Sequence, residues 1–116
     1  MNQYLYRIQP TRPAMLSEGP TPEEAAAVGA HFGYLQDLVD TGKVLMAGRT
    51  LTTDERSFGI VVFEASSEEA AQALVEADPA VKAEVMRAEL FPYRVALWSK
   101  FGPSGAESTN AEKSAD

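Results

Sequence analysis

The chain has 116 residues, a length that suits one domain and is too short for two full hydrophobic cores. Its composition, 45% hydrophobic and 23% charged, is that of a globular protein and excludes a disordered chain. Seventeen acidic against ten basic side chains give a net charge of −7. Because such a protein repels phosphate backbones and anionic lipid surfaces, we expect neither a nucleic acid nor a membrane as its partner.

Two residue counts restrict the chemistry further. The chain has no cysteine, which excludes disulfides, thiolate metal sites and thiol nucleophiles. A single histidine, His31, argues against an all-protein zinc site, so we expect no metal. The sequence has no run of about 18 apolar residues and no basic segment followed by an apolar one at its start. A cytoplasmic location is therefore expected.

The first half of the chain predicts a strand, a loop and a helix. Residues 4–9 alternate, with Tyr4, Tyr6 and Ile8 on one face, and the strand ends at Pro10. A loop over 11–20 is long enough to shape a pocket. Thr21-Pro22-Glu23-Glu24 is a capping-box helix start, and Gly42 ends the helix. Its apolar face is expected to comprise Val28, Phe32, Leu35 and Val39.

The second half predicts two strands, a helix and a last strand. Residues 43–49 and 57–64 are the strands, joined by a polar loop. A helix starts at Ser66 or Ser67, ends before Pro79, and is followed by a short helical turn at 80–85. The last strand is expected over 88–98, broken or bulged at Pro92. The apolar face of the helix is expected to comprise Ala70, Ala73, Leu74 and Ala77.

This order, β-α-β-β-α-β, predicts an α+β, ferredoxin-like domain over residues 1–100, with a four-stranded antiparallel sheet and helices on one face. Residues 101–116 are expected to be a disordered acidic tail. Strands two, three and four are apolar on both faces, whereas an antiparallel sheet with one exposed face should be polar on that face. We therefore predict a homodimer packed sheet against sheet.

His31 and Asp78 are the leading candidates for chemistry. On a helical wheel His31 lies about 60° from the centre of the expected apolar face, at 100° per residue. It is therefore either a boundary histidine bonded to backbone or a general acid or base. Asp78 precedes Pro79, where a carboxylate commonly caps the local backbone. It would do more if it reached His31, because a carboxylate partner fixes the imidazole tautomer.

Arg49 and Ser57 are candidates for binding substrate. Arg49 follows Gly48 at the end of a predicted strand, where its guanidinium could neutralise a substrate carboxylate or simply be solvated. Ser57 and Arg56 flank the next strand and are weaker candidates. The sequence has no phosphate-binding loop, nucleophile elbow or dinucleotide fingerprint.

Several segments, in order and with compatible spacing over about residues 3–99, carry a family resemblance. They are His31-Phe32-Gly33-Tyr34-Leu35, Val44-Leu45-Met46-Ala47-Gly48, Phe58-Gly59-Ile60-Val61-Val62-Phe63-Glu64, Asp78-Pro79-Ala80-Val81 and Glu89-Leu90-Phe91-Pro92-Tyr93. The chain resembles the YciI-like (YCII-related domain) family of dimeric α/β-barrel proteins. The resemblance implies that His31 and Asp78 form an active-site pair. One branch of the family resembles dehydrochlorinases and muconolactone-isomerase-like enzymes. Many relatives have Ala-Gly-Pro where this chain has Ala47-Gly48-Arg49.

These observations lead to a functional hypothesis. The chain is expected to be a cofactor-independent lyase or isomerase, in which His31 and Asp78 transfer a proton on a small organic acid held by Arg49. The alternative is a non-catalytic small-molecule-binding or accessory module on the same dimeric fold. A monooxygenase on this fold, with the lone histidine as an axial haem ligand, is a third possibility that topology leaves open.

Overall fold

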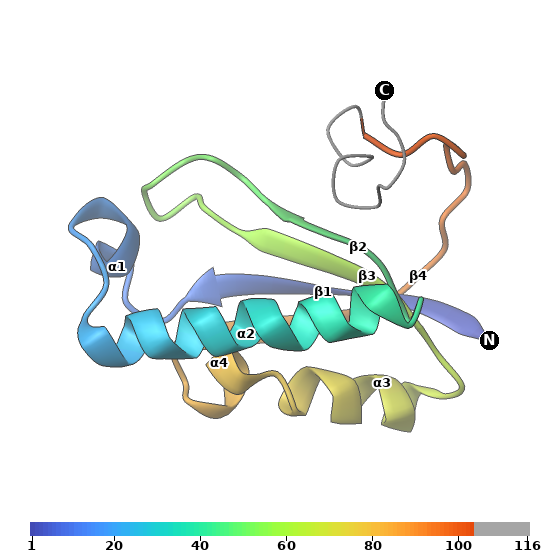
Figure 1. Ribbon diagram of the computed structural model, residues 1–116, viewed down its shortest axis with the longest axis horizontal. Helices are drawn as coiled ribbons and strands as arrows, with labels where there is room; N and C mark the ends of the chain where they lie inside the picture. The colour runs from blue at the N-terminus through green and yellow to red at the C-terminus, as the bar shows by residue number, and fades with distance from the viewer. Residues whose placement is uncertain (104–116) are drawn as a thin grey trace.

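The computed structural model describes residues 1–103, in which four antiparallel strands form one sheet with helices against one of its faces (Figure 1). The strands are ordered β2-β3-β1-β4, which confirms the predicted ferredoxin-like α+β fold. All but the first three residues of the predicted acidic tail, 101–116, lie outside the described residues. The elements are β1 (Asn2–Pro10), α1 (Ala14–Ser17), α2 (Pro22–Asp40), β2 (Val44–Arg49), β3 (Gly59–Ala65), α3 (Glu68–Glu76), α4 (Pro79–Lys82) and β4 (Met86–Tyr93).

The helix boundaries follow the local signals in the sequence. At the start of α2 the Glu24 backbone N–H donates to Thr21 Oγ1 at 3.1 Å, and the Thr21 N–H donates to Glu24 Oε1 at 2.8 Å. This reciprocal pair confirms the predicted capping box. Gly42, with φ +81°, takes the left-handed conformation that follows the end of α2. Ser67 caps α3 through its side chain.

The core lies between the helices and the inner face of the sheet. β1 contributes Tyr4, Tyr6 and Ile8, as its alternation predicted, and β3 contributes Val61, Phe63 and Ala65. The rings of Tyr6 and Phe63 meet edge to face, with centroids 5.8 Å apart and an interplanar angle of 78°. Burying a tyrosine this deeply requires a partner for its hydroxyl group.

The predicted apolar face of α2 is wrong, because α2 is rotated about its axis so that a different row of residues faces the core. Phe32 and Val39 are 68% and 42% exposed, while Leu35 is buried. The inward row instead includes His31 and Tyr34. Two hydrogen bonds fix this rotation, because the His31 ring bonds to Asp78 and the Tyr34 hydroxyl donates to the Leu74 carbonyl at 2.6 Å.

The predictions for two further elements are also wrong in part. The segment 11–20 is not wholly a loop, since it contains the single-turn helix α1 with a buried Met15. In α3, Ala73 and Ala77 are exposed, and the buried residues are Ala71, Leu74 and Val75. A helix rich in alanine presents apolar side chains on several faces, so the apolar pattern does not identify the inward face.

β4 ends at Tyr93 rather than at Trp98, which corrects the predicted last strand. β4 lies at the edge of the sheet with β1 as its neighbour, and Tyr93 already pairs with Gln3, close to the start of β1. Beyond that pair only Asn2 of β1 remains. Residues 94–103 leave the sheet on the side away from the helices (Figure 1), and Leu97 is 94% exposed. Pro92 is tolerated because β4 is an edge strand.

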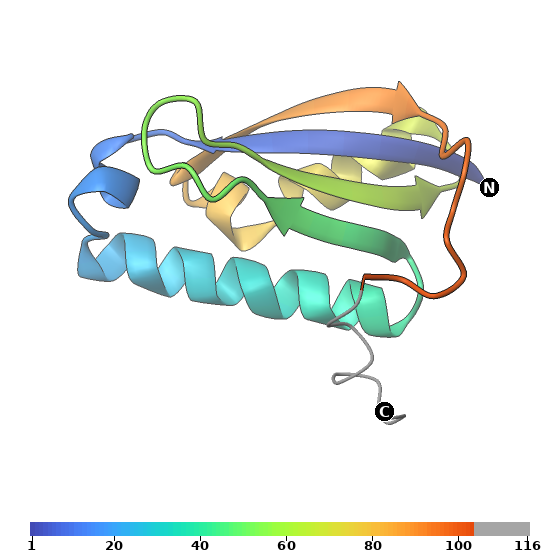
Figure 2. The same cartoon turned by 90° about the horizontal axis from the view of Figure 1, so that it is seen from above.

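The face of the sheet opposite the helices carries an apolar row that crosses all four strands. Met46, Val62, Leu5 and Phe91 are successive partners in the strand register, one from each strand. Figure 2 shows the sheet from the side on which no helix is packed, with the strands in the order of their pairing. We call these four residues the open-face row. Beside it, on the same face, Arg7 forms an ion pair with Glu89.

Candidate functional site

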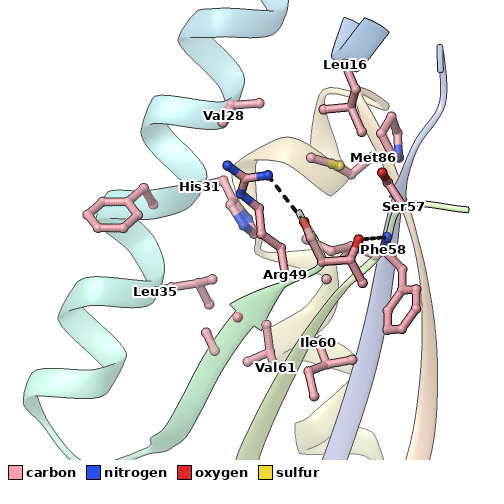
Figure 3. Close-up of a pocket in the computed structure, with 17 residues that line it drawn as sticks. Leu16, Val28, His31, Leu35, Arg49, Ser57, Phe58, Ile60, Val61 and Met86 are labelled. Atoms are coloured by element: carbon pink, nitrogen blue, oxygen red, sulfur yellow. Dashed lines mark hydrogen bonds between the residues drawn. The ribbon is translucent and has the colours of Figure 1, made fainter. Parts of the chain in front are cut away.

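A cavity of about 300 Å³ lies between α2 and the sheet, near the carboxyl end of β2 and the start of β3. Its walls are largely apolar, and the close-up in Figure 3 shows the labelled side chains around it. Four lining residues carry polar side chains: His31, Arg49, Thr50 and Ser57. The apolar side chains include Ile8, Leu16, Val28, Leu35, Val61 and Met86. The cavity thus combines a mainly apolar body with a few polar groups, as small-molecule sites do.

His31 and Asp78 meet at the inner side of this cavity. His31 Nδ1 lies 2.8 Å from Asp78 Oδ2 and 2.9 Å from Asp78 Oδ1. The side chain of His31 is 12% exposed and that of Asp78 is fully buried. The two residues come from the middle of α2 and from the turn before α4, which lie next to each other in the fold. The contact that the sequence could only suggest is therefore present.

The carboxylate of Asp78 accepts hydrogen bonds from two further donors. The Tyr6 hydroxyl donates to Oδ2 at 2.7 Å, and the Ala80 backbone N–H donates to Oδ1 at 2.9 Å. The bond from Ala80 is the local cap that the Asp-Pro pair indicated, so Asp78 both caps α4 and holds His31. Three donors from three elements converge on one buried carboxylate, and its position is fixed accordingly.

These contacts determine the charge of Asp78. Burial alone raises the pKa of the Asp78 carboxyl, since it disfavours the ionised form. The hydrogen bonds from His31 and Tyr6, the charge of His31 and the Ala80 N–H outweigh burial and hold that pKa below its ordinary value. Burial, together with the same carboxylate, raises the pKa of Tyr6 far above its usual range. Asp78 is therefore an anion at neutral pH, and Tyr6 stays protonated as a donor.

The geometry also assigns the free nitrogen of the imidazole. An ionised carboxylate accepts only, so Nδ1 carries the proton that it shares with Asp78. His31 lines the cavity, whereas Asp78 lies behind it. The opposite edge of the ring, with Nε2, therefore faces the cavity. Within residues 1–103, no side chain or backbone group forms a hydrogen bond with Nε2. A neutral imidazole held in this way presents a base to whatever occupies the cavity.

Arg49 lies at the exposed side of the cavity. Its guanidinium makes one long hydrogen bond, 3.4 Å, to the carbonyl of the adjacent Thr50. Arg7, Arg12 and Arg56 each form an ion pair with a carboxylate, but Arg49 has no such partner within the described part of the chain. Figure 3 shows the Arg49 side chain reaching from β2 toward α2, on the same side of the cavity as His31. Its place suits an anionic group, and its role in binding stays a prediction.

Ser57 also lines the cavity, but its hydroxyl is already engaged. Ser57 Oγ donates to the Thr52 carbonyl and lies 3.0 Å from Thr52 Oγ1, which in turn lies 2.9 Å from Thr50 Oγ1. This chain of hydroxyls ties together the loop between β2 and β3. The predicted contact of Ser57 with substrate stays a prediction. Arg56 pairs with Asp54 on the surface and does not line the cavity.

Sequence reasoning missed two residues of the site. Tyr6 was predicted only as a core residue, although a buried tyrosine that needs a hydroxyl partner was a usable signal. Gly59 lines the cavity at the start of β3. A Cβ at Gly59 would lie 3.1 Å from the Gly48 carbonyl oxygen and 3.2 Å from Ile8 Cγ1, so any side chain there would press on the cavity wall.

Residues 1–103 contain no group of three or more His, Asp or Glu side chains placed to hold a metal ion. None of the helices described between residues 1 and 103 is both long and apolar enough to cross a membrane.

The fold and the paired His31 and Asp78 define a ferredoxin-like protein with a small-molecule-sized cavity beside a histidine–aspartate pair. Comparison with protein families matches residues 4–99 to the YCII-related domain. The chain therefore belongs to the YCII-related domain family, which confirms the resemblance seen in the sequence.

Comparison with solved structures finds a 5-chloro-2-hydroxyhydroquinone dehydrochlorinase from Burkholderia phenoliruptrix, in complex with 2,5-dihydroxybenzoquinone. The TM-score is 0.57 at 23% sequence identity, and the match covers 78% of this chain and 93% of that one. This likeness supports the shared fold. Comparison with curated proteins finds no match.

Proposed function

We propose that the chain is a lyase or isomerase that moves a proton on a small organic acid, with His31 as the acid or base. One observation carries the proposal: a buried, ionised carboxylate holds Nδ1 of the imidazole, so that Nε2 faces a largely apolar cavity of about 300 Å³. A histidine that served only packing would not need both a charged partner and an open side.

The chemistry follows from the protonation states. Nε2 would take a proton from a carbon of the substrate, and Asp78 would stabilise the imidazolium that forms without taking the proton itself. In an elimination the electron pair left on carbon forms a double bond as a leaving group departs. In an isomerisation the imidazolium returns the proton to a different carbon. The apolar walls strengthen the interaction between His31 and Asp78, because they keep water away from the ring.

Arg49 would bind the anionic group of the substrate. It lines the same cavity as His31, it is exposed, and it has no carboxylate partner within residues 1–103. A guanidinium in this state can pair with a substrate anion without first breaking an ion pair of its own. The substrate would then span the distance between a proton-accepting nitrogen and the Arg49 cation.

The structural neighbour suggests a practical probe. It was solved with 2,5-dihydroxybenzoquinone, a planar ring with acidic hydroxyls, and such a compound offers both an apolar body and an anionic group. Binding of this probe to the present chain can be followed without knowledge of the true substrate. A panel of unsaturated and hydroxylated ring acids then extends the search to turnover.

The test is exchange of carbon-bound hydrogen for deuterium in D₂O, followed by proton NMR over this panel. We expect the wild-type protein to exchange at least one compound and His31→Asn to lose the activity by about a hundredfold or more. Gln36→Ala, on the exposed side of the same helix, is the matched control and should leave exchange unchanged. Wild-type exchange by a folded His31→Asn protein would overturn the assignment. Binding without exchange would instead assign the cavity to a non-catalytic binding module.

We also propose that the protein is a homodimer through the open-face row. This row places four apolar side chains side by side across the sheet, and no helix within residues 1–103 covers that face. Met46 and Phe91 within it are 39% and 43% exposed, and Tyr93, on the same face, is 46% exposed. Val62 in the middle of the row is only 3% exposed, so the accessible apolar surface lies toward the two edge strands. Exposed apolar surface on one sheet face marks an interaction site, and a second copy offers the complementary surface.

The proposal of a dimer is tested by sedimentation or light scattering at micromolar concentration. The wild-type protein should have twice the chain mass of 12.5 kDa, and Phe91→Asp should have the mass of one chain. Leu51→Asp is the control, because Leu51 is 85% exposed and lies in the loop between β2 and β3, outside the row. A monomeric wild-type protein would contradict the proposal.

A further inference from the structure

Tyr6 occupies a position that the proposed chemistry does not by itself explain. It is fully buried in the core, and its hydroxyl donates to Asp78 Oδ2 at 2.7 Å. That oxygen is also 2.8 Å from His31 Nδ1. Two protonated groups, one from β1 and one from α2, therefore share one carboxylate oxygen.

The sharing has a consequence for the imidazole. A carboxylate attracts an imidazolium more strongly when its charge is not already neutralised in part by other donors. The hydroxyl of Tyr6 withdraws charge from Oδ2, and it remains a hydrogen-bond donor at neutral pH because burial and Asp78 raise the pKa of Tyr6. Asp78 therefore attracts a protonated His31 less strongly than a carboxylate without the Tyr6 hydrogen bond would.

We propose that Tyr6 is a positioning residue that acts through Asp78 to lower the proton affinity of His31. Without it, the paired carboxylate would favour the imidazolium and reduce the free base at neutral pH. With it, Asp78 keeps Nδ1 protonated and oriented, while Nε2 stays available to accept a proton. This role supports the proposed function, and it is tested without any substrate.

Four groups that titrate or carry charge surround the imidazole or line its cavity. Asp78 lies before α4, Tyr6 on β1, Tyr34 one turn further along α2, and Arg49 on β2. Tyr34 lies near enough for the charge of Asp78, after burial, to raise the pKa of its hydroxyl. However, the Tyr34 hydroxyl donates to the Leu74 carbonyl at 2.6 Å and not to Asp78. Tyr34 is therefore a natural control for Tyr6.

The experiment is an NMR titration of the imidazole, which is unambiguous because the chain has one histidine. Tyr6→Phe keeps the ring that packs against Phe63 and removes only the hydroxyl. We expect its titration midpoint to rise by about half a unit or more above that of the wild-type protein. Tyr34→Phe removes a hydroxyl that is only partly buried and that donates to the Leu74 carbonyl, and it should leave the midpoint within about 0.2 units, because no bond to Asp78 is lost. An unchanged or lowered midpoint in Tyr6→Phe would overturn the inference, as would an equal rise in both variants.

A second measurement covers the case in which Tyr6→Phe does not fold. In the wild-type protein, the Cζ resonance of Tyr6 should show an inflection at the pH where His31 titrates, since both groups share Oδ2. The raised pKa of Tyr6 excludes its own ionisation as the source of an inflection near neutral pH. A Tyr6 resonance that does not respond as His31 titrates would overturn the proposal. Loss of deuterium exchange bears on the proposed function alone, so the two failures are distinguishable.

Discussion

The inner and outer ends of the cavity are built differently. At the inner end, β1, α2 and α4 each supply a donor to Asp78, which is fully buried. At the outer end, the one hydrogen bond of the Arg49 side chain to another described residue goes to the neighbouring Thr50 carbonyl at 3.4 Å, and Phe32 is 68% exposed. The inner end is thus part of what holds the fold together, while the outer end can change without disturbing it. We infer that the reacting groups are fixed by the fold and that the choice of substrate is made at the mouth.

The largest expected effect is at the inner end. Asp78→Ala leaves the buried donors of Tyr6, His31 and Ala80 without their acceptor, so the free energy of unfolding should fall by about 3–5 kcal/mol at pH 7. Urea denaturation measures this change. Asp54→Ala, which removes the surface partner of Arg56, is the control and should change it by less than about 1 kcal/mol. If Asp78→Ala lowers the unfolding free energy by no more than Asp54→Ala does, the inner end of the cavity does not stabilise the fold in the way described.

The effect of Asp78 should also depend on pH in a defined direction. Its pKa is lower in the folded protein than the ordinary value of 3.8, so its ionised form stabilises the fold. That contribution is fully present above about pH 4 and is lost as the pH falls from there through the folded-state pKa. The difference in unfolding free energy between wild type and Asp78→Ala should therefore shrink below pH 4. If this difference in unfolding free energy instead grows as the pH falls below 4, the predicted direction of the pH dependence is wrong.

The next effect is at the outer end and concerns binding alone. Arg49→Gln should weaken binding of 2,5-dihydroxybenzoquinone by about 10- to 100-fold, which is about 1.4–2.8 kcal/mol. The unfolding free energy should stay within about 0.5 kcal/mol, because Arg49 holds no buried partner. Calorimetry gives the affinity, and Arg56→Gln, on a cation outside the cavity, is the matched control. If Arg49→Gln binds 2,5-dihydroxybenzoquinone with wild-type affinity, the Arg49 guanidinium does not bind the anionic group of this ligand.

The smallest effect is expected at Ser57, which lines the cavity and is also hydrogen-bonded within the loop between β2 and β3. Ser57→Ala removes the hydrogen bond to the Thr52 carbonyl and should lower the unfolding free energy by about 1 kcal/mol. Binding of the same probe should weaken by less than about threefold, because the hydroxyl is already engaged in the loop. A tenfold loss of affinity would show that Ser57 turns its hydroxyl to the ligand.

The order of elements and the topology could be predicted from the sequence because their signals are local. Alternation in β1, the capping box at Thr21 and Glu24 and the glycine after α2 each act over a few residues. The end of β4 could not be predicted this way, since it depends on where β1 begins. The strand-like residues after Tyr93 have no partner within the described sheet, and their own propensity does not extend the strand.

The site was predictable in its residues but not in its geometry. His31 and Asp78 stood out by residue type, and yet the rotation of α2 that brings His31 inward depends on contacts with α3 and with the turn before α4. Tyr6 could not be singled out from the sequence, because it is one of three residues on the same face of β1. Which of the two tyrosine hydroxyls, Tyr4 or Tyr6, meets Asp78 is decided by the position of β1 relative to the turn before α4, a tertiary relation that no local pattern encodes.

The central claim is that Asp78 holds His31 as a base facing the cavity, and the titration of this single imidazole in Asp78→Asn tests it most directly. Replacing the carboxylate by a neutral amide removes the charge that favours the imidazolium, so the titration midpoint should fall by about one unit or more. In the wild-type protein the nitrogen shifts of the neutral ring should show Nδ1 protonated and Nε2 free. An unchanged midpoint in folded Asp78→Asn, or a proton on Nε2 of the neutral wild-type ring, would contradict the account.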